Sequence, residues 1–367
     1  MNAAENTGAD LRSAPTFIDL VIPERVKESL GEQLAGLGDP AQDMDRAMAL
    51  CHQIFATLPI DLLQSILDFG RHADTPGVAR VGNLPVEHGL PDTPDDGGPC
   101  RTKSTYLSEG VLLGLSGMLG EPVEFTTEKN GQLIHDVIPV ADGATTQTNR
   151  SSTVFLNFHN DIVYDEAGSY NASNPDFLVL NCLRADHEGV AGTYYADARD
   201  VCQALDASSL KLLTEPLFRL NAPGGYARLV GKSETLSAPA PIISGPEWCP
   251  EIASSANGVH ALSPEAEAAL RRLQSACREV AHEVFLRPGQ ALLINNRKGL
   301  HARSEFEPRY DGRDRWLQRT YIRRNHWSIR DRVVSRTRRL LRHGGQGGRR
   351  ADSGWVAPVC GRDHRRN

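Results

Sequence analysis

The short apolar runs between residues 78 and 322 constrain the fold more than any other feature of the chain. In this region, runs rich in β-branched and aromatic residues alternate with turns of Gly, Pro and Asn, a pattern typical of β-strands. No strict strand–helix–strand repeat accompanies them, so a doubly wound parallel sheet is not expected. We predict a mainly β or α+β protein with helices packed on one side of an antiparallel sheet. The strands are predicted at 78–85, 133–140, 153–159, 177–183, 193–196, 291–295 and 316–322.

Helical periodicity is found in other parts of the chain. Apolar residues spaced as on one face of a helix run through the first 75 residues, where Pro40 and Pro59 stand at expected helix starts. Ser263, followed directly by Pro264, has the residue types preferred at a helix N-cap and first turn. The later helices are predicted at 102–119, 197–213 and 263–281.

The 367 residues, of which 40% are hydrophobic and 23% charged, have the composition of an ordinary globular protein. A long segment rich in Gly, Pro and Ser precedes the last predicted helix, and loops of this length inside a domain are usually functional or disordered. We expect a helical flank at 1–75, a main domain at 76–330 with a loop or lid at 221–259, and an Arg-rich, partly disordered tail at 331–367.

The net charge of −6 is unevenly distributed. Residues 330–367 contain 11 Arg and three Asp, a net charge of +8 that leaves −14 for the rest of the chain. Such a tail can bind nucleic acid through its phosphates, or it can lie on the acidic body of its own chain. Because no series of aromatic residues for base stacking accompanies the arginines, we favour the second interpretation and expect no nucleic-acid partner.

The sequence also bears on the location of the protein. No apolar run reaches the length needed to cross a membrane, and the first ten residues lack the basic and apolar segments of a secretory signal. The seven cysteines are scattered and include no C-x-x-C pair, which argues against a disulfide framework or a zinc knuckle. We therefore expect a cytoplasmic protein without a membrane partner, and a homo-oligomer stays open.

The segment 154–161, with the sequence VFLNFHND, ends in a histidine and an aspartate two residues apart. Alternate side chains of a strand point to the same face, so His159 and Asp161 can converge while Asn160 turns away. An imidazole and a carboxylate placed in this way form two thirds of the 2-His-1-carboxylate triad that holds non-haem Fe(II). The pair alone is weak evidence for a metal site, since a surface histidine beside an aspartate in a turn has the same sequence pattern.

A second segment, 291–322, contains the groups that such a site still lacks. Its apolar strand ends in polar residues and leads to His301, and Arg315 opens a further strand fourteen residues later. Arg319 lies four residues beyond Arg315 and therefore on the same face of that strand. Two guanidinium groups in one cavity require two anions as ligands.

Together these motifs resemble the clavaminate synthase-like branch of the TauD-related Fe(II)/2-oxoglutarate-dependent oxygenases, which includes L-arginine, L-asparagine and L-lysine hydroxylases. The resemblance runs from about Glu121 to Arg324, and it implies a double-stranded β-helix (jelly roll) core with flanking helices, in agreement with the predicted strands. The motifs follow one another in the family's order: Glu128, 135–139, 159–161, 182–184, 192–193 and 301–319.

The resemblance implies that His159, Asp161 and His301 are the catalytic metal ligands of an Fe(II) site. It also implies that Arg315 binds the distal carboxylate of the cosubstrate 2-oxoglutarate, that the hydroxyl of Thr193 helps to hold this molecule, and that O2 is the oxidant. Many close members have Glu where this chain has Asp161, but both carboxylates ligate iron, so the substitution does not threaten the metal site.

The resemblance further implies a small amino-acid substrate. Arg319 matches the residue that binds the substrate α-carboxylate, and Glu128 matches the carboxylate that receives the α-ammonium group. Asn149, Arg150 and Ser151 fall where the family contacts substrate, and their spacing does not choose firmly among them.

The substrate side chain is expected to be uncharged. Arginine, asparagine and lysine hydroxylases of this branch have Asp shortly before the helix that is predicted here at 263–281, whereas this chain has Ser255 and Asn257. A buried cationic side chain without a carboxylate is costly, so lysine and arginine are expected to be poor substrates. Glu247 or Glu251 would fill this role if the preceding loop were shifted.

The implied activity is hydroxylation of a free L-amino acid or a close derivative at Cβ, in the biosynthesis of specialised metabolites such as antibiotics. Desaturation or another oxidative tailoring reaction is the alternative within the family. From other classes, a nucleic-acid-associated protein that uses the Arg-rich tail, or a non-catalytic binding protein, stays open. The complete triad with Arg315 argues against the last of these.

Overall fold

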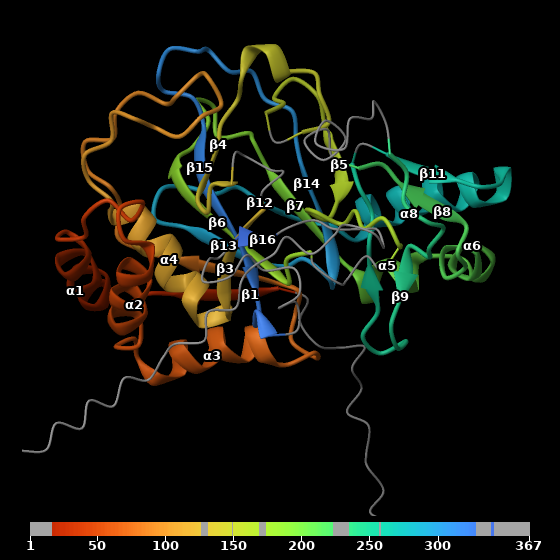
Figure 1. Ribbon diagram of the computed structural model, residues 1–367, viewed down its shortest axis with the longest axis horizontal. Helices are drawn as coiled ribbons and strands as arrows, with labels where there is room; N and C mark the ends of the chain where they lie inside the picture. Colours follow the sequence, from red (N-terminus) through yellow and green to blue (C-terminus); the bar gives the residue numbers. More distant parts are fainter. Residues whose placement is uncertain are drawn as a thin grey trace, which may run out of the picture.

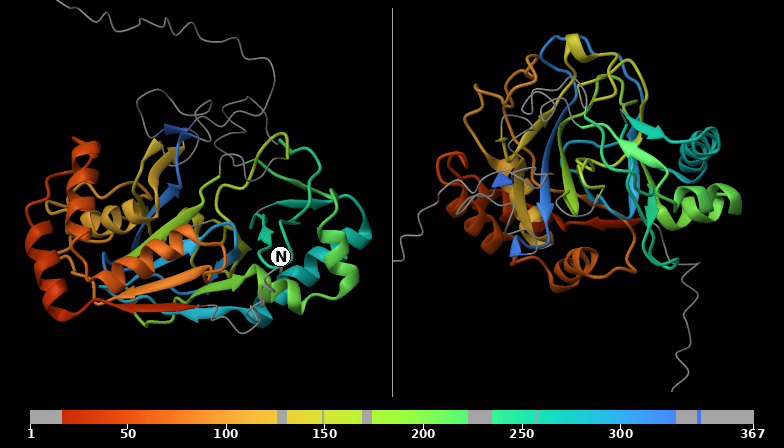
Figure 2. Two further views of the ribbon diagram at one scale, coloured as in Figure 1. Left: turned by 90° about the horizontal axis from the view of Figure 1, so that it is seen from below. Right: turned by 45° about the vertical axis from the view of Figure 1, so that its right-hand side comes forward.

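The structure is a computed structural model that describes residues 17–125, 131–148, 150–168, 174–222, 235–256, 258–327 and 339–340, the last two by their backbone alone. Its centre consists of a larger sheet of eight strands and a smaller sheet of four. Helices cover the outer face of each sheet, so the layers run helices, larger sheet, smaller sheet, helices (Figures 1 and 2). The predicted mixture of helix and sheet is confirmed.

The larger sheet has the strand order β1-β2-β13-β6-β15-β3-β16, and β4 also pairs with β15. All of its pairings are antiparallel except β1 with β2 and β3 with β16. Four of the predicted strands form its centre. The strands are β1 (Ile18–Val21), β2 (Val78–Gly82), β3 (Glu121–Phe125), β4 (His135–Val137), β6 (Phe177–Arg184), β13 (Ala291–Asn295), β15 (Trp316–Arg323) and β16 (Arg339–Leu340).

Alternation along β6 and β13 separates two apolar cores. Leu178 and Leu292 pack between the sheets, whereas their neighbours Val179 and Leu293 pack against helices on the outer face. Because both faces are covered, these strands are apolar along nearly their whole length. The covering helices are α1 (Glu24–Leu34), α2 (Met44–Phe55), α3 (Ile60–Arg71) and α4 (Leu107–Leu119).

The smaller sheet is antiparallel throughout and has the order β12-β7-β14-β5. Leu300 and Ala302 on its outer face pack against three further helices, and the N-cap of the longest is Ser263, as predicted. Its strands are β5 (Leu156–His159), β7 (Thr193–Asp197), β12 (His282–Val284) and β14 (Gly299–Arg303), and the helices are α5 (Ala198–Ala204), α6 (Ala207–Leu213) and α8 (Pro264–Val280). A short 3-10 helix, η3 (Ala141–Gly143), precedes β5.

The structure corrects three predictions about these elements. Helices pack on both sides of the sheet pair and not on one side, because α5, α6 and α8 bury apolar faces of their own against the smaller sheet. The first 75 residues are not all helical, since 18–21 form β1 and extend the larger sheet beyond β2. The strands predicted between residues 291 and 322 omit 299–303, whereas these residues form a separate strand, β14, which carries His301 in the other sheet.

The segment 221–259, predicted as a loop or lid, contains packed structure in its described part. Ile242, Ile243 and Ile252 are buried in the core beneath α8, so this part is not a featureless loop. Residues 223–234 and Asn257 lie outside the described residues. One small antiparallel pair, β9 (Ile243–Ser244) with β10 (Glu251–Ile252), lies within this segment. A second, β8 (Phe218–Leu220) with β11 (Val259–Ala261), joins the chain at its two ends.

Within the described part of the chain, the helices are too short or too polar to cross a membrane.

Candidate active site

A cavity of about 220 Å³ lies between the two sheets. Its walls come from β4, β5, β6, β7, β14 and β15, so it opens among strands that are distant in sequence. The histidines and charged side chains in its described lining are His159, Asp161, His301, Arg303, Arg315 and Arg319. Five of these six were predicted as site residues, and the structure brings all five together.

The strand register places His159 and His301 side by side. They are direct partners in the antiparallel pair β5–β14, and their ring centroids are 4.4 Å apart. Leu300 and Ala302 point outward to the helices, so the imidazole of His301 points inward.

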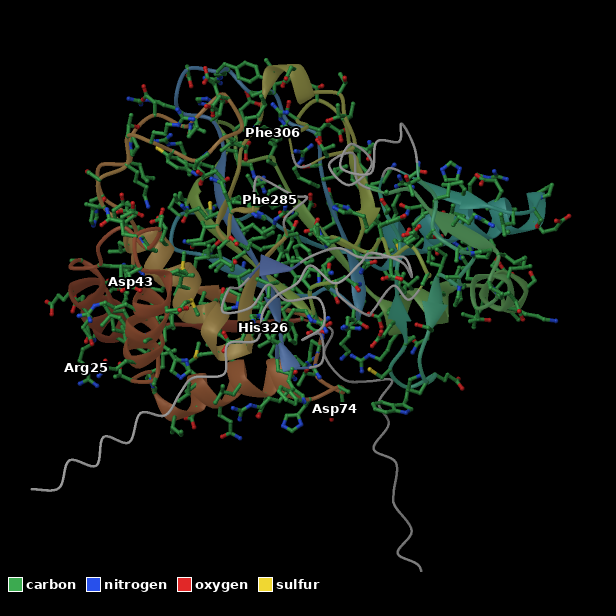
Figure 3. The ribbon with its side chains drawn as sticks, viewed as in Figure 1. Arg25, Asp43, Asp74, Phe285, Phe306 and His326 are labelled. Carbon is green, nitrogen blue, oxygen red and sulfur yellow. The ribbon has the colours of Figure 1, made fainter. Side chains whose placement is uncertain are left out.

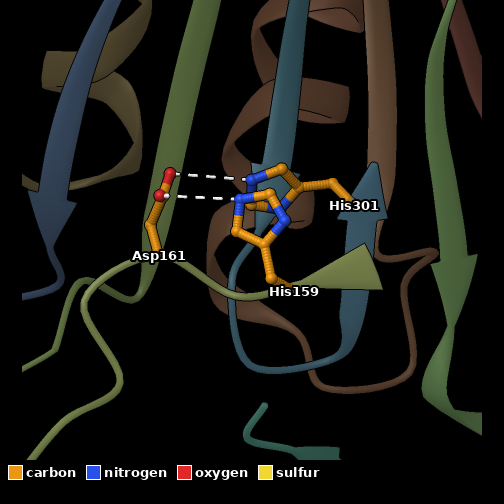
Figure 4. A group of neighbouring side chains, drawn as sticks. All are labelled: His159, Asp161 and His301. Atoms are coloured by element: carbon orange, nitrogen blue, oxygen red, sulfur yellow. Dashed lines mark ion pairs between the residues drawn. The ribbon is translucent and has the colours of Figure 1, made fainter. Parts of the chain in front are cut away.

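Asp161 follows β5 by two residues and completes the group (Figure 4). Its Oδ1 lies 4.0 Å from Nε2 of His159, and its Oδ2 lies 3.6 Å from Nε2 of His301. The Nδ1 of His159 is 2.7 Å from the carbonyl oxygen of Asn157, which can only accept a hydrogen bond, so Nδ1 carries the proton. The lone pair of Nε2 therefore faces Asp161, in the form that binds a metal ion.

The surroundings of His159 and Asp161 shift the pKa values of these two residues in the direction that metal binding needs. Burial, and next the neighbouring His301, lower the pKa of His159 to about 4, so its imidazole is neutral. Burial alone would raise the pKa of the Asp161 carboxyl, but Arg319 and the two histidines outweigh this effect and hold it below its usual range. Neutral imidazole and ionised carboxylate are the ligand forms that metals require.

Asn160, just beyond the end of β5, is among the residues that line the cavity, but its side chain is buried and forms hydrogen bonds to neighbouring segments. Its amide nitrogen donates to the carbonyl oxygens of Asn296 and Gly299, at 2.7 and 2.6 Å. Its amide oxygen accepts from the backbone nitrogen of Ser254 at 3.0 Å. Asn160 therefore ties the segment between the two proposed ligands to the chain before β14 and to the cavity wall near Ser255.

Arg315 and Thr193 meet at one end of the cavity. Nη2 of Arg315 donates to Oγ1 of Thr193 at 3.3 Å, and both side chains are buried. Burial lowers the pKa of the Arg315 guanidinium, yet arginine stays charged in proteins, so this end of the cavity attracts an anion. A planar guanidinium beside a hydroxyl suits a carboxylate ligand.

Arg303 is a cavity residue that the sequence analysis missed. Its guanidinium donates to the carbonyl oxygens of Ser151 and Val154, and it lies 5.1 Å from the ring centroid of Phe306. Figure 3 labels the position of Phe306. Burial, and next the nearby Arg315, lower its pKa to about 9. The signal was present in the sequence, because Arg303 follows His301 by two residues on the same strand face.

The substrate candidates before β5 are placed differently from the prediction. Arg150 forms an ion pair with Asp142 at the surface, and Ser151 is buried beside Arg303, so neither lines the cavity. Gln147 and Thr148, which the sequence analysis did not single out, line it instead.

Of the remaining predicted site residues, Ser255 lines the cavity. Glu128, Asn149 and Asn257 lie outside the described residues.

Comparisons with known proteins show what this chain is similar to. Residues 108–321 match the family model of the taurine catabolism dioxygenases TauD and TfdA. An L-asparagine oxygenase of Streptomyces coelicolor (strain ATCC BAA-471 / A3(2) / M145) is 36% identical over 305 residues, which cover 83% of this chain and 87% of that protein. An L-lysine 3-hydroxylase of Catenulispora acidiphila is 30% identical over 273 residues, 73% of each chain.

Solved structures show the same likeness. The crystal structure of asparagine oxygenase in complex with Fe(II), 2S,3S-3-hydroxyasparagine and succinate has a TM-score of 0.78 to this chain at 32% sequence identity. The match covers 88% of this chain and 99% of that one. The family model spans more than half of the chain, and the similarity to the L-asparagine oxygenase extends over most of both proteins. The chain therefore belongs to the taurine catabolism dioxygenase family, TauD/TfdA.

Proposed function

We propose that this chain is an Fe(II)- and 2-oxoglutarate-dependent hydroxylase of a free L-amino acid or a close derivative, acting at Cβ in specialised-metabolite biosynthesis in the cytoplasm. The observation that carries the proposal is the convergence of His159, Asp161 and His301 on a cavity that also receives Arg315 and Arg319. The asparagine oxygenase solved with Fe(II), hydroxyasparagine and succinate supports the same chemistry. The two stacked sheets agree with a double-stranded β-helix.

The donor set fits Fe(II). Two histidines and one carboxylate on one side of a cavity match the 2-His-1-carboxylate donor set that would hold Fe(II). Iron held by these residues would supply the oxidation of a substrate C–H bond by O2, coupled to the decarboxylation of 2-oxoglutarate to succinate and CO2. The protein contributes binding, orientation and exclusion of water.

Arg315 and Arg319 are assigned to different ligands. Arg315 and Thr193 bind the distal carboxylate of 2-oxoglutarate at one end of the cavity, and Arg319 binds the α-carboxylate of the amino acid beside Asp161. Glu128 and Asn149 are assigned to the polar groups of the amino acid, and Ser255 and Asn257 to its side chain. The walls between these groups hold the target carbon near the metal.

The charges of the cavity favour a substrate with an uncharged side chain. Three arginines and one carboxylate, Asp161, are found in the described lining, so a cationic side chain meets no free carboxylate there. Glu251 forms an ion pair with Arg297 at 3.6 Å, and Glu247 is exposed; neither is among the described lining residues. This placement supports the expectation that lysine and arginine are poor substrates.

Succinate release tests the proposal. Purified protein is incubated with Fe(II), 2-oxoglutarate, air and each of the twenty amino acids in turn, and succinate and oxidised product are measured together. We expect coupled release with at least one neutral amino acid and a product heavier by one oxygen atom. A product that has instead lost two hydrogens supports the desaturase alternative.

The nucleic-acid alternative has its own measurement. The protein is mixed with duplex DNA or RNA at about 150 mM salt, where weak phosphate binding falls away, and tested for a gel shift. No succinate with any amino acid, together with a gel shift that persists at this salt concentration, would overturn the proposed function.

A further inference from the structure

The loop between β14 and β15 brings Arg315 to the cavity. The residue before it, Asp314, is a buried aspartate. Asp314 is 3% exposed, although it carries a charge and lies in a loop. Buried carboxylates are costly unless hydrogen bonds satisfy them. The hydrogen bonds of the Asp314 carboxylate therefore show which parts of the chain it stabilises.

The carboxylate of Asp314 folds the loop back on itself. Its two oxygens accept hydrogen bonds from the backbone nitrogens of Arg309 and Tyr310, at 2.7 and 2.6 Å. Tyr310 has a φ of +53°, a left-handed conformation that residues other than glycine rarely adopt. Two charge-assisted hydrogen bonds stabilise a turn that the local sequence does not favour.

The backbone of Asp314 is fastened as well. Its carbonyl oxygen accepts from Oγ1 of Thr93 at 2.7 Å, and the backbone nitrogen of Thr93 donates to the carbonyl oxygen of Gly312 at 2.8 Å. Arg184 at the end of β6 donates to the same Gly312 oxygen at 2.7 Å and to that of Pro91 at 3.0 Å. The loop is thus tied to a segment more than 200 residues earlier in the chain.

A histidine faces the same carboxylate from the chain after β6. Nε2 of His187 lies 3.5 Å from Oδ1 of Asp314 and 3.2 Å from Oδ1 of Asp311. Asp314 therefore has partners on its own loop, on the chain near Thr93 and on the chain after β6.

The guanidinium of Arg315, in contrast, forms only weak contacts with other described residues. Its hydrogen bond to Thr193 is 3.3 Å, beyond the usual range of strong N–H···O bonds, and its Cζ lies 6.0 Å from the ring centroid of Phe306. The direction of its side chain therefore depends on the backbone at its base, which is the backbone that Asp314 fixes.

We propose that Asp314 is a positioning residue for the cosubstrate site, because its buried carboxylate fixes the loop from which Arg315 reaches the distal carboxylate of 2-oxoglutarate. This inference rests on the proposed function, which assigns Arg315 to 2-oxoglutarate. Asp314 itself is not among the described residues that line the cavity. Arg319 does not depend on this loop, because pairing of β15 with β4 and β6 holds it.

The test compares Asp314→Ala, Asp314→Asn and, as a matched control, Asp311→Asn. Asp311 lies in the same loop, but its side chain is 44% exposed. Iron-loaded protein is titrated with 2-oxoglutarate without oxygen, and the charge-transfer absorption of the complex is followed. We expect the dissociation constant to rise about tenfold or more in Asp314→Ala and less in Asp314→Asn, which keeps one acceptor oxygen. Asp311→Asn should stay within about twofold of the unmodified protein.

Steady-state kinetics and unfolding separate positioning from simple stability. The KM for 2-oxoglutarate should rise while the KM for the amino acid stays within about twofold, and every titration is run below the unfolding midpoint of each variant. An unchanged dissociation constant in folded Asp314→Ala, or in Asp314→Asn if the alanine variant does not fold, would overturn the inference. Equal increases in both KM values would overturn it too. Failure of the unmodified protein to bind 2-oxoglutarate would instead overturn the proposed function.

Discussion

Arg319 donates a hydrogen bond from Nη1 to Oδ2 of Asp161 across 2.8 Å. This contact joins the residue proposed to bind the substrate to a proposed iron ligand. The same Oδ2 lies 3.6 Å from Nε2 of His301, so Asp161 is oriented from two sides, while Oδ1 faces His159 at 4.0 Å. A carboxylate can bind a metal through one oxygen and keep a guanidinium on the other, so this contact would couple the proposed iron site to the proposed substrate site.

The Arg319→Lys variant tests whether Arg319 binds the amino-acid substrate. Lysine keeps the positive charge but loses the planar fork, so it cannot contact Asp161 and a substrate carboxylate together as arginine can. We expect the KM for the amino acid to rise about tenfold or more, equivalent to about 1.4 kcal/mol, with a smaller change in the KM for 2-oxoglutarate. Steady-state kinetics with each ligand varied in turn checks this. An unchanged amino-acid KM would remove Arg319 from the substrate site.

Arg315→Lys should act on the other ligand. A bidentate charge-assisted contact is worth about 1.5–3 kcal/mol, so its loss should raise the 2-oxoglutarate requirement roughly ten- to a hundredfold. The measurement is succinate release against 2-oxoglutarate concentration. Arg313→Lys, at an exposed position two residues earlier, is the matched control and should behave like the unmodified protein. Equal behaviour of the two variants would contradict the assignment of Arg315.

Asp161→Ala should abolish hydroxylation and leave the fold intact, because iron loses its anionic ligand while the sheets keep their packing. Product formation, iron content and the circular dichroism spectrum are measured together. Asp142→Ala removes a carboxylate whose side chain is 74% exposed and should keep full activity. Retention of most activity by Asp161→Ala with ordinary iron would mean that the triad is wrongly assigned.

Asn160→Ala should lower the free energy of unfolding by about 3 kcal/mol or more. The change leaves two buried carbonyl oxygens and one buried N–H without their partner, and each such group costs about 1–3 kcal/mol. Denaturant unfolding measures the effect. Asn157→Ala, three residues earlier, removes only a 3.3 Å contact of its amide oxygen with Arg278 and should cost less than about 1 kcal/mol. Similar losses in both variants would contradict the role of Asn160.

Local patterns in the sequence were sufficient for seven strands of the two sheets and for much of the site, although β1, β3, β12 and β14 were not predicted. The spacing of His159 and Asp161 predicted their convergence because strand alternation is a local rule. The same rule placed Arg315 and Arg319 on one wall, and applied to His301 it would also have found Arg303. Residues close in sequence therefore needed no knowledge of the fold.

Long-range relationships could not be predicted in this way. The three residues 296–298 carry the chain from β13 in the larger sheet to β14 in the smaller one, and an apolar run does not show to which sheet it belongs. The contact of Asn160 with Asn296 likewise joins residues 136 positions apart. Such long-range contacts depend on how the sheets pack against each other, and the spacing of residues along the sequence does not determine that packing.

The last prediction concerns the substrate side chain. Lysine and arginine should be turned over at least about tenfold less efficiently than the best neutral amino acid, because the described lining offers Ser255 and no carboxylate beyond Asp161, which Arg319 already contacts. The kcat/KM values across the amino-acid panel measure this. Ser255→Asp should raise the relative rate with lysine or arginine, whereas Ser255→Asn, which adds similar volume without charge, should not. Turnover of lysine or arginine by the unmodified protein above that of every neutral amino acid would show that a carboxylate outside the described lining receives the side chain.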